Sequence, residues 1–196
     1  MKFLIILSLI CIFCTGCSND SDNSNNTNNN NTSATRISSK EKQPVEEEIS
    51  TFSTIIYIKD ENRQNNLTLA CSQLNGTIVR NGETFSFCDT LGPAKPEDGY
   101  QKADTFDRDG DIFQEYGGGK CQVSSTLYNA VLNIPNIEIL ERHPHSGDVD
   151  YVEEGKDAAV AYGSVDFKFS NNTGYDIKIQ ASNTPDNVNI SIIKIS

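Results

Sequence analysis

Two short stretches hold the residues that are best suited to chemistry. Residues 116–125 read Y-G-G-G-K-C-Q-V-S-S, so Cys121 follows three glycines and a lysine. The chain has two histidines, His143 and His145, and both lie in R-H-P-H-S. A cysteine nucleophile is commonly activated by a histidine that acts as its base. The two stretches therefore predict cysteine nucleophilic chemistry, provided that the fold brings them together.

The periodicity after the glycines predicts a helix from about Cys121 to Asn133. At about 3.6 residues per turn, its apolar side comprises Val123, Leu127, Ala130 and Val131. Its other side comprises Cys121, Ser124, Ser125 and Tyr128. A thiol in the first turn meets the positive end of the helix dipole, which lowers the thiol pKa. Gly118 and Gly119 would allow close approach of a substrate and aim backbone N–H groups at a developing oxyanion.

Other uses of these residues have less support. A phosphate-binding loop needs G-x-x-x-x-G-K-[ST], but Gln114 replaces the first glycine and Cys121 replaces the hydroxyl. Cys121 and the histidines could bind a metal, yet they lack the spacing of known zinc sites, and we expect no metal and no other cofactor. An H-P-H turn with two solvated histidines explains the second stretch as well as catalysis does.

Three cysteines follow residue 50, namely Cys71, Cys88 and Cys121. Because the number is odd, at least one has no partner within the domain. A disulfide between Cys71 and Cys88 would contribute about 3 kcal/mol to stability. Two buried thiols are the alternative. In either case Cys121 is left over.

The N-terminal part is predicted to direct export. Residues 1–17 contain an early lysine and an apolar run, which together indicate a secretory signal. The small residues before Cys17 resemble a bacterial lipobox, which would leave Cys17 lipidated; plain secretion is the alternative. Residues 18–49 are rich in Asn, Ser and Thr and predict a disordered linker. We expect a domain held at the outer face of the bacterial cytoplasmic membrane, or secreted.

Residues 50–196 are enough for one domain with a core of its own. The net charge of -11 argues against a nucleic-acid partner and against binding to anionic lipid. The membrane would then be met only through the N-terminal lipid anchor.

Periodicity predicts an α+β fold for this single domain. Residues 63–75 predict the first of two main helices, and a strand–turn–strand unit is expected around Asn81-Gly82. Residues 137–142 predict a buried strand. Period-two alternation in four later segments predicts an antiparallel C-terminal meander packed with the two helices. The segments are A-A-V-A-Y at 158–162, V-D-F-K-F at 165–169, Y-D-I-K-I-Q-A at 175–181 and N-V-N-I-S-I-I-K-I at 187–195.

Several stretches, in order, resemble the VanW family. The most specific is G-G-G-K-C-Q-V-S-S-T-L-Y-N-A, at residues 117–130. Others are G-E-T-F-S-F at 82–87, E-R-H-P-H-S at 141–146, Y-V-E-E-G-K-D-A-A-V at 151–160 and D-F-K-F-S-N-N-T at 166–173. The resemblance covers nearly the whole folded part. Lys120 stands where the family usually has an apolar residue.

Some members of this family look like cysteine L,D-transpeptidases of the cell wall. The resemblance implies that Cys121 attacks the carbonyl between the diamino acid and D-alanine of a peptidoglycan stem peptide. D-Alanine leaves, and the side-chain amine of a neighbouring stem resolves the acyl-enzyme into a 3–3 crosslink. His145 would be the general base and later the acid, with His143 as the second candidate.

The resemblance also implies roles for further residues. Asp157 would orient the histidine or recognise substrate, or is only a turn aspartate. Ser124 and Ser125 would line the site or cap the helix. Arg142 and Tyr151 would contact substrate carboxylates or simply pack.

A different class of function is also compatible with the resemblance. The domain could be a non-catalytic cell-wall-binding or accessory lipoprotein linked to glycopeptide resistance or envelope homeostasis. The glycines and Cys121 would then shape a ligand groove. In both hypotheses the partners are peptidoglycan stem peptides.

Overall fold

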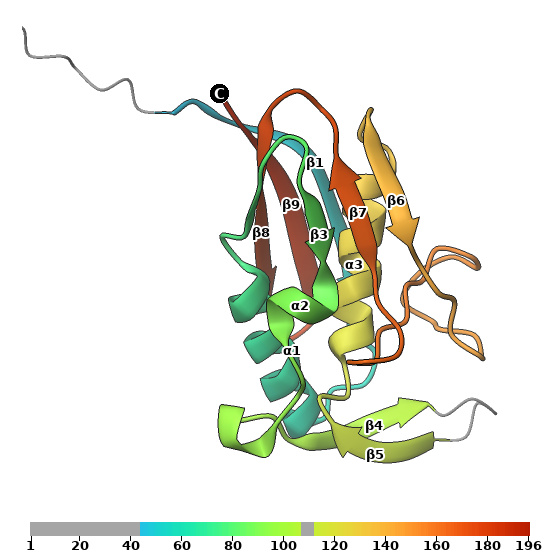
Figure 1. Cartoon of the computed structure of the whole chain (residues 1–196). Coiled ribbons are helices and arrows are strands. Elements are labelled where there is room, and N and C mark those ends of the chain that lie inside the picture. The colour runs from blue at the N-terminus through green and yellow to red at the C-terminus, as the bar shows by residue number, and fades with distance from the viewer. Residues whose placement is uncertain (1–43, 107–111) are drawn as a thin grey trace, which may run out of the picture. The chain divides into compact units, whose positions relative to one another are not determined.

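The computed structural model describes residues 44–106 and 112–196 (Figure 1). The predicted signal, Cys17 and most of the predicted linker lie outside the described residues. In chain order the elements are β1 (Glu46–Ile55), α1 (Glu61–Leu74), β2 (Ile78–Val79), β3 (Thr84–Ser86), α2 (Phe87–Leu91), a 3-10 turn (Pro96–Asp98), β4 (Lys102–Phe106), β5 (Ile112–Tyr116), α3 (Lys120–Leu132), β6 (Ile137–Glu141), β7 (Lys168–Asn171), β8 (Asp176–Asn183) and β9 (Asn187–Ile195).

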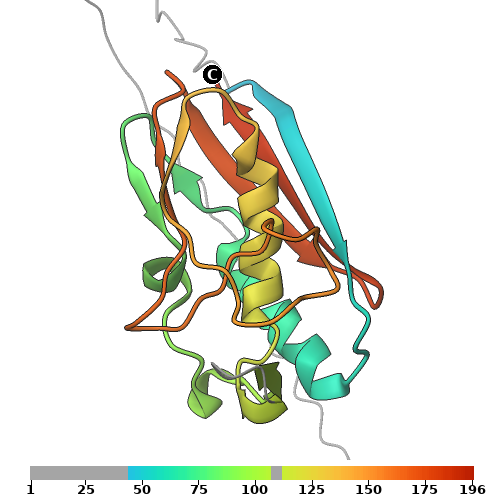
Figure 2. The same cartoon turned by 90° about the vertical axis from the view of Figure 1, so that its right-hand side faces the viewer.

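The described strands form three antiparallel sheets, in the orders β1-β9-β8-β2, β3-β7-β6 and β4-β5. Helix α3 packs against β1 and β9 on one side and contacts β6 on the other (Figure 2). The α+β class, with antiparallel sheets in a single compact domain, is confirmed. The two predicted helices correspond to α1 and α3.

The pairing of the strands differs from a simple meander. Strands β2 and β3 flank the predicted Asn81-Gly82 turn, but β2 pairs with β8 and β3 pairs with β7. Strand β7 therefore lies in a different sheet from β8, and only β8 and β9 form a long hairpin. Residues 158–162 make only isolated bridges. The amides of Ala158 and Val160 face α3, where they donate to Ser125 Oγ and toward Cys121 Sγ, while those of Ala159 and Ala161 form the bridges.

Strand β1 begins inside the segment that we predicted as linker. Its glutamates lack the apolar alternation of a strand, but the backbone pairs with β9 from Glu46 onward. Glu46 and Glu47 also form ion pairs with Lys178 and Lys194. The predicted boundary at residue 50 is therefore too late, because cross-strand partners stabilise this stretch.

Strand β6 is less buried than we predicted. Its side chains alternate between half-buried and exposed, and Leu140 is 50% exposed. The reason is its place in the sheet, since β6 is an edge strand beside β7. Ile137 and Ile139 pack against the core, whereas Leu140 lies on the exposed side of the strand.

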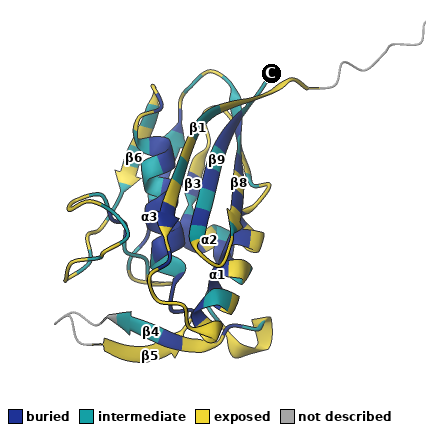
Figure 3. Ribbon diagram, turned by 180° about the vertical axis from the view of Figure 1, so that it is seen from behind, coloured by how far each residue is buried: buried dark blue, intermediate teal, exposed yellow. Residues whose placement is uncertain are grey.

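Helix α3 is buried on nearly all sides (Figure 3). The predicted apolar side, Val123, Leu127, Ala130 and Val131, is fully buried. The hydroxyl-bearing side is buried as well, because Ser124, Ser125 and Thr126 have no exposed surface. Most of these polar groups are satisfied locally, as Thr126 Oγ1 lies 2.7 Å from the Gln122 carbonyl oxygen and 2.8 Å from Thr54 Oγ1. A buried polar group needs such partners to be tolerated.

The chain enters the domain at one end and α3 begins at the other. The first residues of β1 lie beside the C-terminus, whereas the start of α3 lies beside the β4–β5 hairpin (Figure 1). None of the helices in the described part of the chain is long and apolar enough to cross a membrane.

Candidate active site

Cys121 and His145 line the same cavity, which has a volume of about 510 Å³. Its wall comes from the β4–β5 hairpin, the glycine turn before α3, the first turns of α1 and α3, and the segments around residues 145–151 and 160–164. The stretches that the sequence singled out are therefore brought together, although they lie more than twenty residues apart in the chain.

The glycine turn holds Cys121 at the rim of this cavity. Gly119 caps α3 with φ 113°, a conformation that favours glycine. A Cβ on Gly118 would lie 2.6 Å from the Ala103 carbonyl oxygen, so only glycine lets β4 pack this closely. The glycines thus admit a neighbouring strand, while Gly118 and Gly119 also line the cavity.

The Cys121 sulfur meets the backbone of Val160. Sγ lies 3.4 Å from the Val160 carbonyl oxygen, and the Val160 amide donates toward Sγ at 3.5 Å. Ser125 holds this segment in place, since its Oγ accepts from the Ala158 amide and donates to the Cys121 carbonyl, both at 2.8 Å. Ser125 is thus a support for the backbone and not a helix cap. Ser124 is buried, and its hydroxyl has no partner in the described part of the chain.

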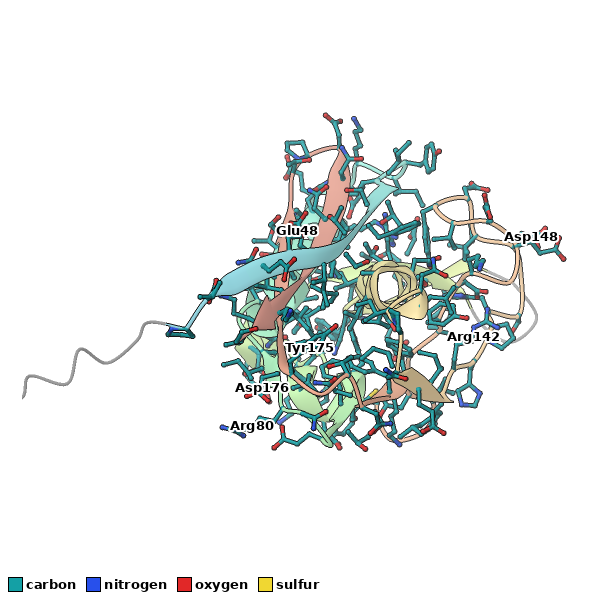
Figure 4. The ribbon with its side chains drawn as sticks, turned by 90° about the horizontal axis from the view of Figure 1, so that it is seen from above. Glu48, Arg80, Arg142, Asp148, Tyr175 and Asp176 are labelled. Atoms are coloured by element: carbon teal, nitrogen blue, oxygen red, sulfur yellow. The ribbon has the colours of Figure 1, made fainter. Side chains whose placement is uncertain are left out.

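Asp157 fixes the orientation of His145. The backbone amide and Nδ1 of His145 both lie 2.6 Å from Asp157 Oδ2. Because Nδ1 donates to the carboxylate, Nε2 is the free nitrogen of the neutral ring. Arg142 Nη2 donates to Asp157 Oδ1 at 2.6 Å, and Arg142 Nε donates to the Asp157 carbonyl oxygen. In Figure 4 Arg142 lies on the side of α3 that faces the loop carrying Asp148.

The pKa shifts describe a coupled pair of acid and base. Burial of the Cys121 thiol raises its pKa, but the hydrogen bond and charge of His145 and the amide of Val160 outweigh burial and bring the pKa below its ordinary value. Burial lowers the pKa of His145, but Cys121 and Asp157 raise it above the ordinary value. Both shifts favour a thiolate beside an imidazolium.

The same balance acts on Asp157. Burial raises the pKa of Asp157. Hydrogen bonds from His145 and the charges of His145 and Arg142 lower it by a larger amount, so the net pKa lies below the ordinary value. Asp157 therefore stays ionised and can stabilise a positive charge on His145. Cys121, His145 and Asp157 form a chain of three polar groups, with Arg142 behind the carboxylate.

His143 lies apart from this chain. Its Nε2 is 3.1 Å from Glu141 Oε1, its side chain is 47% exposed, and it is not among the residues that line the cavity. The structure thus brings one of the two predicted histidines, His145, to Cys121 and leaves the other at the surface. Asp157 makes the difference, because it contacts only the second histidine of the H-P-H stretch.

Tyr151 and Lys120 have different positions around the cavity. Tyr151 packs its ring edge against His145, with 6.5 Å between ring centroids, and burial raises the pKa of its phenol. Lys120 turns away from the thiol, because its Nζ donates to the Gly92 carbonyl at 2.7 Å and lies 5.4 Å from the Tyr100 ring centre. Burial lowers the Lys120 pKa. Its ammonium group ties the Gly92 loop to the cavity wall.

Sequence reasoning missed Arg63 and Asn66 in the first turns of α1. Arg63 lines the cavity, is only 9% exposed, and donates from Nη2 to Gln122 Oε1 at 3.0 Å. Asn66 Nδ2 donates to the Gly118 carbonyl at 3.1 Å and so holds the glycine turn. A signal was present, because Arg63 lies four residues before Leu67 and thus on the buried side of α1.

Cys71 and Cys88 are free thiols and are not joined to each other. Burial raises the pKa of each to about 12. Within residues 44–106 and 112–196, no group of three or more His, Cys, Asp or Glu side chains is arranged to hold a metal ion.

Comparison with known proteins now identifies the family. A family model described as VanW like protein matches residues 62–193, which is most of the described part of the chain. The chain belongs to the VanW-like family. The predicted resemblance is therefore confirmed.

Two curated relatives share about a third of their aligned residues with this chain. The uncharacterized protein YoaR of Bacillus subtilis (strain 168) is 34% identical over 135 residues, covering 69% of this chain and 44% of the relative. The vancomycin B-type resistance protein VanW of Enterococcus faecalis (strain ATCC 700802 / V583) is 33% identical over 125 residues, covering 59% and 43%. The chain thus spans less than half the length of each VanW-like relative. No solved structure matches it significantly.

Proposed function

We propose that this domain is a cysteine acyltransferase that acts on peptidoglycan stem peptides. The observation that supports it is that Cys121 and His145 line one cavity and Asp157 binds Nδ1 of His145, with the pKa of the thiol lowered and that of the imidazole raised. A thiol, a base and a group that orients the base are the usual parts of a cysteine nucleophile.

In the first half of the reaction, the Cys121 thiol proton passes to His145 Nε2. The thiolate attacks the carbonyl carbon between the diamino acid and D-alanine, and the carbonyl oxygen becomes an oxyanion. As the C–N bond breaks, His145 returns its proton to the departing amine. Free D-alanine leaves, and the stem peptide remains on Cys121 as a thioester.

In the second half, the side-chain amine of a neighbouring stem attacks the thioester carbonyl. His145 takes the proton of this amine, and the C–S bond breaks to give an amide crosslink. The proton on the imidazolium returns to the Cys121 thiolate. Asp157 stabilises the imidazolium at each stage, and Arg142 keeps Asp157 in position.

The start of α3 offers donors for the oxyanion. The amides of Gly119 and Cys121 have no hydrogen-bond acceptor among the described residues, and both residues line the cavity. Unused amides at a helix N-terminus favour negative charge. One such donor is typically worth about 3 kcal/mol of transition-state stabilisation.

The proposal includes export and attachment. The predicted signal, the lipidation of Cys17 and the linker would place the domain at the outer face of the bacterial cytoplasmic membrane, where stem peptides are accessible. The name of the enterococcal relative connects the family to vancomycin resistance, a phenotype of the cell wall.

Mass spectrometry of the purified protein tests this function. After incubation with the tetrapeptide L-Ala-D-Glu-diamino acid-D-Ala, we expect a tripeptide thioester on Cys121 and release of D-alanine. Cys121→Ala should form no adduct, whereas Cys71→Ala, which changes a thiol away from the cavity, should form it normally. Absence of any adduct, together with tetrapeptide binding that is unaffected by Cys121→Ser, would instead indicate a wall-binding module.

A further inference from the structure

The guanidinium of Arg63 is buried at the cavity with unused hydrogen-bond donors. Nη2 donates to Gln122 Oε1 at 3.0 Å, and Nε is buried with no partner in the described part of the chain. No described residue accepts a hydrogen bond from Nη1. Side chains as enclosed as Arg63, which is 9% exposed, normally have their polar atoms paired. The free donors therefore point to a partner that the protein itself does not supply.

The charge of Arg63 is also not paired with a carboxylate. The nearby Asp60 carboxylate is engaged as the cap of α1, where it accepts from the Arg63 backbone amide at 2.9 Å. Asp104, on the hairpin that lines the cavity, accepts from Gln114 Nε2 at 3.4 Å. Among the described carboxylates, none lies within 4.0 Å of the Arg63 guanidinium. Because a buried unpaired charge is costly, the site favours an anionic ligand.

The anion would bind next to the nucleophile. Gln122, which holds Nη2, is the residue after Cys121, and the charge of Arg63 helps to lower the pKa of Cys121. In a peptide, successive Cα atoms are about 3.8 Å apart, so a terminal carboxylate lies close to the carbonyl of the preceding residue. A guanidinium placed beside the attacking sulfur can therefore reach the carboxylate of a single leaving residue.

We propose that Arg63 binds the C-terminal carboxylate of the residue that leaves, so that the site acts only on the last peptide bond of a free C-terminus. A planar guanidinium recognises a carboxylate through paired charge-assisted hydrogen bonds. The leaving residue departs with its carboxylate intact and its amine protonated by His145. This inference rests on the proposed function, and it makes Arg63 the residue that selects C-terminal donors over internal peptide bonds.

A comparison of two matched peptides tests the inference. The tetrapeptide acid and its C-terminal carboxamide differ only in the group that would meet Arg63. For the full chain, we expect kcat/KM of thioester formation to be at least about tenfold higher for the acid, because a hydrogen-bonded charge is lost in the amide. Arg63→Gln should reduce this ratio to near one, and Arg80→Gln, which changes an exposed arginine paired with Glu83, should leave it unchanged. Equal rates for acid and amide in the wild type would overturn the inference.

The charge of Arg63 must be separated from its hydrogen bonding. Arg63→Lys keeps a positive charge beside Cys121 but loses the planar pair of donors. We expect it to keep the pH profile of Cys121 alkylation by iodoacetamide while the acid-to-amide ratio falls several-fold. If the ratio stays at the wild-type value in both Arg63→Lys and Arg63→Gln, Arg63 is only a structural residue and the inference fails.

Binding without turnover separates this inference from the proposed function. Cys121→Ala cannot form a thioester, so calorimetry on it measures affinity alone. Preference for the acid in Cys121→Ala, lost when Arg63→Gln is added, supports carboxylate recognition even if the wild type makes no thioester. Equal affinity for acid and amide in Cys121→Ala contradicts the inference, even if the wild type is an active transferase.

Discussion

Cys88 and Cys121 occupy similar positions in the fold but have opposite chemistry. Each is the second residue of a helix, α2 or α3, and each lines the same cavity. Each sulfur also lies 3.4 Å from a backbone carbonyl, that of Val165 for Cys88 and that of Val160 for Cys121. Yet the pKa of Cys88 is raised to about 12, and that of Cys121 is lowered.

The difference comes from the neighbours of each thiol. Both thiols are buried, which raises their pKa, and at Cys88 the carboxylate of Asp166 raises it further. At Cys121 the imidazole of His145 acts in the opposite direction. A helix N-terminus is thus not sufficient to make a reactive cysteine, and the charge of the nearest side chain decides between an inert and an activated thiol.

The largest expected effect comes from removing His145. In His145→Gln, burial of Cys121 remains while the partner that opposes it is lost, so the thiol pKa should rise above its ordinary value of 9.0. Alkylation of Cys121 by iodoacetamide at pH 7 should slow by about 100-fold, the range expected when a general base is lost. Peptide mass mapping across pH 5–10 would measure it, with exposed His143 changed to Gln as the control. Equal alkylation rates of Cys121 in the wild type and in His145→Gln would show that His145 does not cause the difference between Cys121 and Cys88.

A smaller effect is expected when Asp157 is changed. Asp157→Asn removes one of the charges that raise the pKa of His145, so that pKa should fall and alkylation at pH 7 should slow by about tenfold. The imidazole pKa can be followed by NMR of its ring protons. An unchanged imidazole pKa would show that Asp157 only holds the loop.

The same variant has a distinct dependence of stability on pH. Because the pKa of Asp157 is lower in the folded state, its contribution is fully present above the ordinary value of 3.8 and is lost as pH falls through the folded pKa. We expect Asp157→Asn to cost about 2 kcal/mol of unfolding free energy at pH 7. The gap to the wild type should narrow below pH 4 in urea unfolding curves. A difference in unfolding free energy that stays constant between pH 7 and pH 3 would contradict the lowered pKa of Asp157.

Asp166→Asn sharpens the comparison from the other side. Asp166 accepts hydrogen bonds from Ser86 Oγ, the Cys88 amide and the Phe167 amide, and its charge raises the pKa of Cys88. Its loss should lower the pKa of Cys88 and increase alkylation of Cys88 by about threefold. Cys88 should still react more slowly than Cys121, because Cys88 has no imidazole to oppose the effect of burial. Labelling of Cys88 as fast as that of Cys121 would show that the charge of Asp166 alone separates the two thiols.

The smallest effect is expected at Lys120. Because its ammonium is bound to the Gly92 carbonyl and Tyr100, Lys120→Met should change the alkylation rate of Cys121 by less than about threefold. It should cost about 1.5 kcal/mol of stability, the lower end of the range for a hydrogen bond to a charged group. Chemical denaturation would measure this loss. A tenfold fall in alkylation would instead make Lys120 an activator of the thiol.

Local sequence signals were sufficient for α1, α3 and the apolar stripe of α3. They were also sufficient to select Cys121 and the pair of histidines as candidates. They could not separate His143 from His145, since both have similar neighbours in the chain. The separation depends on Asp157, which reaches His145 from a position twelve residues away.

The other features that the sequence did not predict also depend on contacts between residues far apart in the chain. Arg63 and Gln122 are 59 residues apart, and Ser125 and Ala158 are 33 residues apart. Strand β7 alternates as a meander strand should, yet it pairs with β3 and β6. Alternation identifies a strand and its buried side, but it does not name the neighbouring strand.

The opposite placement of β1 and the start of α3 has a consequence for a protein fixed at its N-terminus. Strand β1 begins beside the C-terminus, and the first residues of α3 lie at the opposite end of the domain, beside the β4–β5 hairpin (Figure 1). In the proposed function, in which the chain is attached through its N-terminal side, the candidate site therefore lies at the end of the domain opposite the first residues of β1.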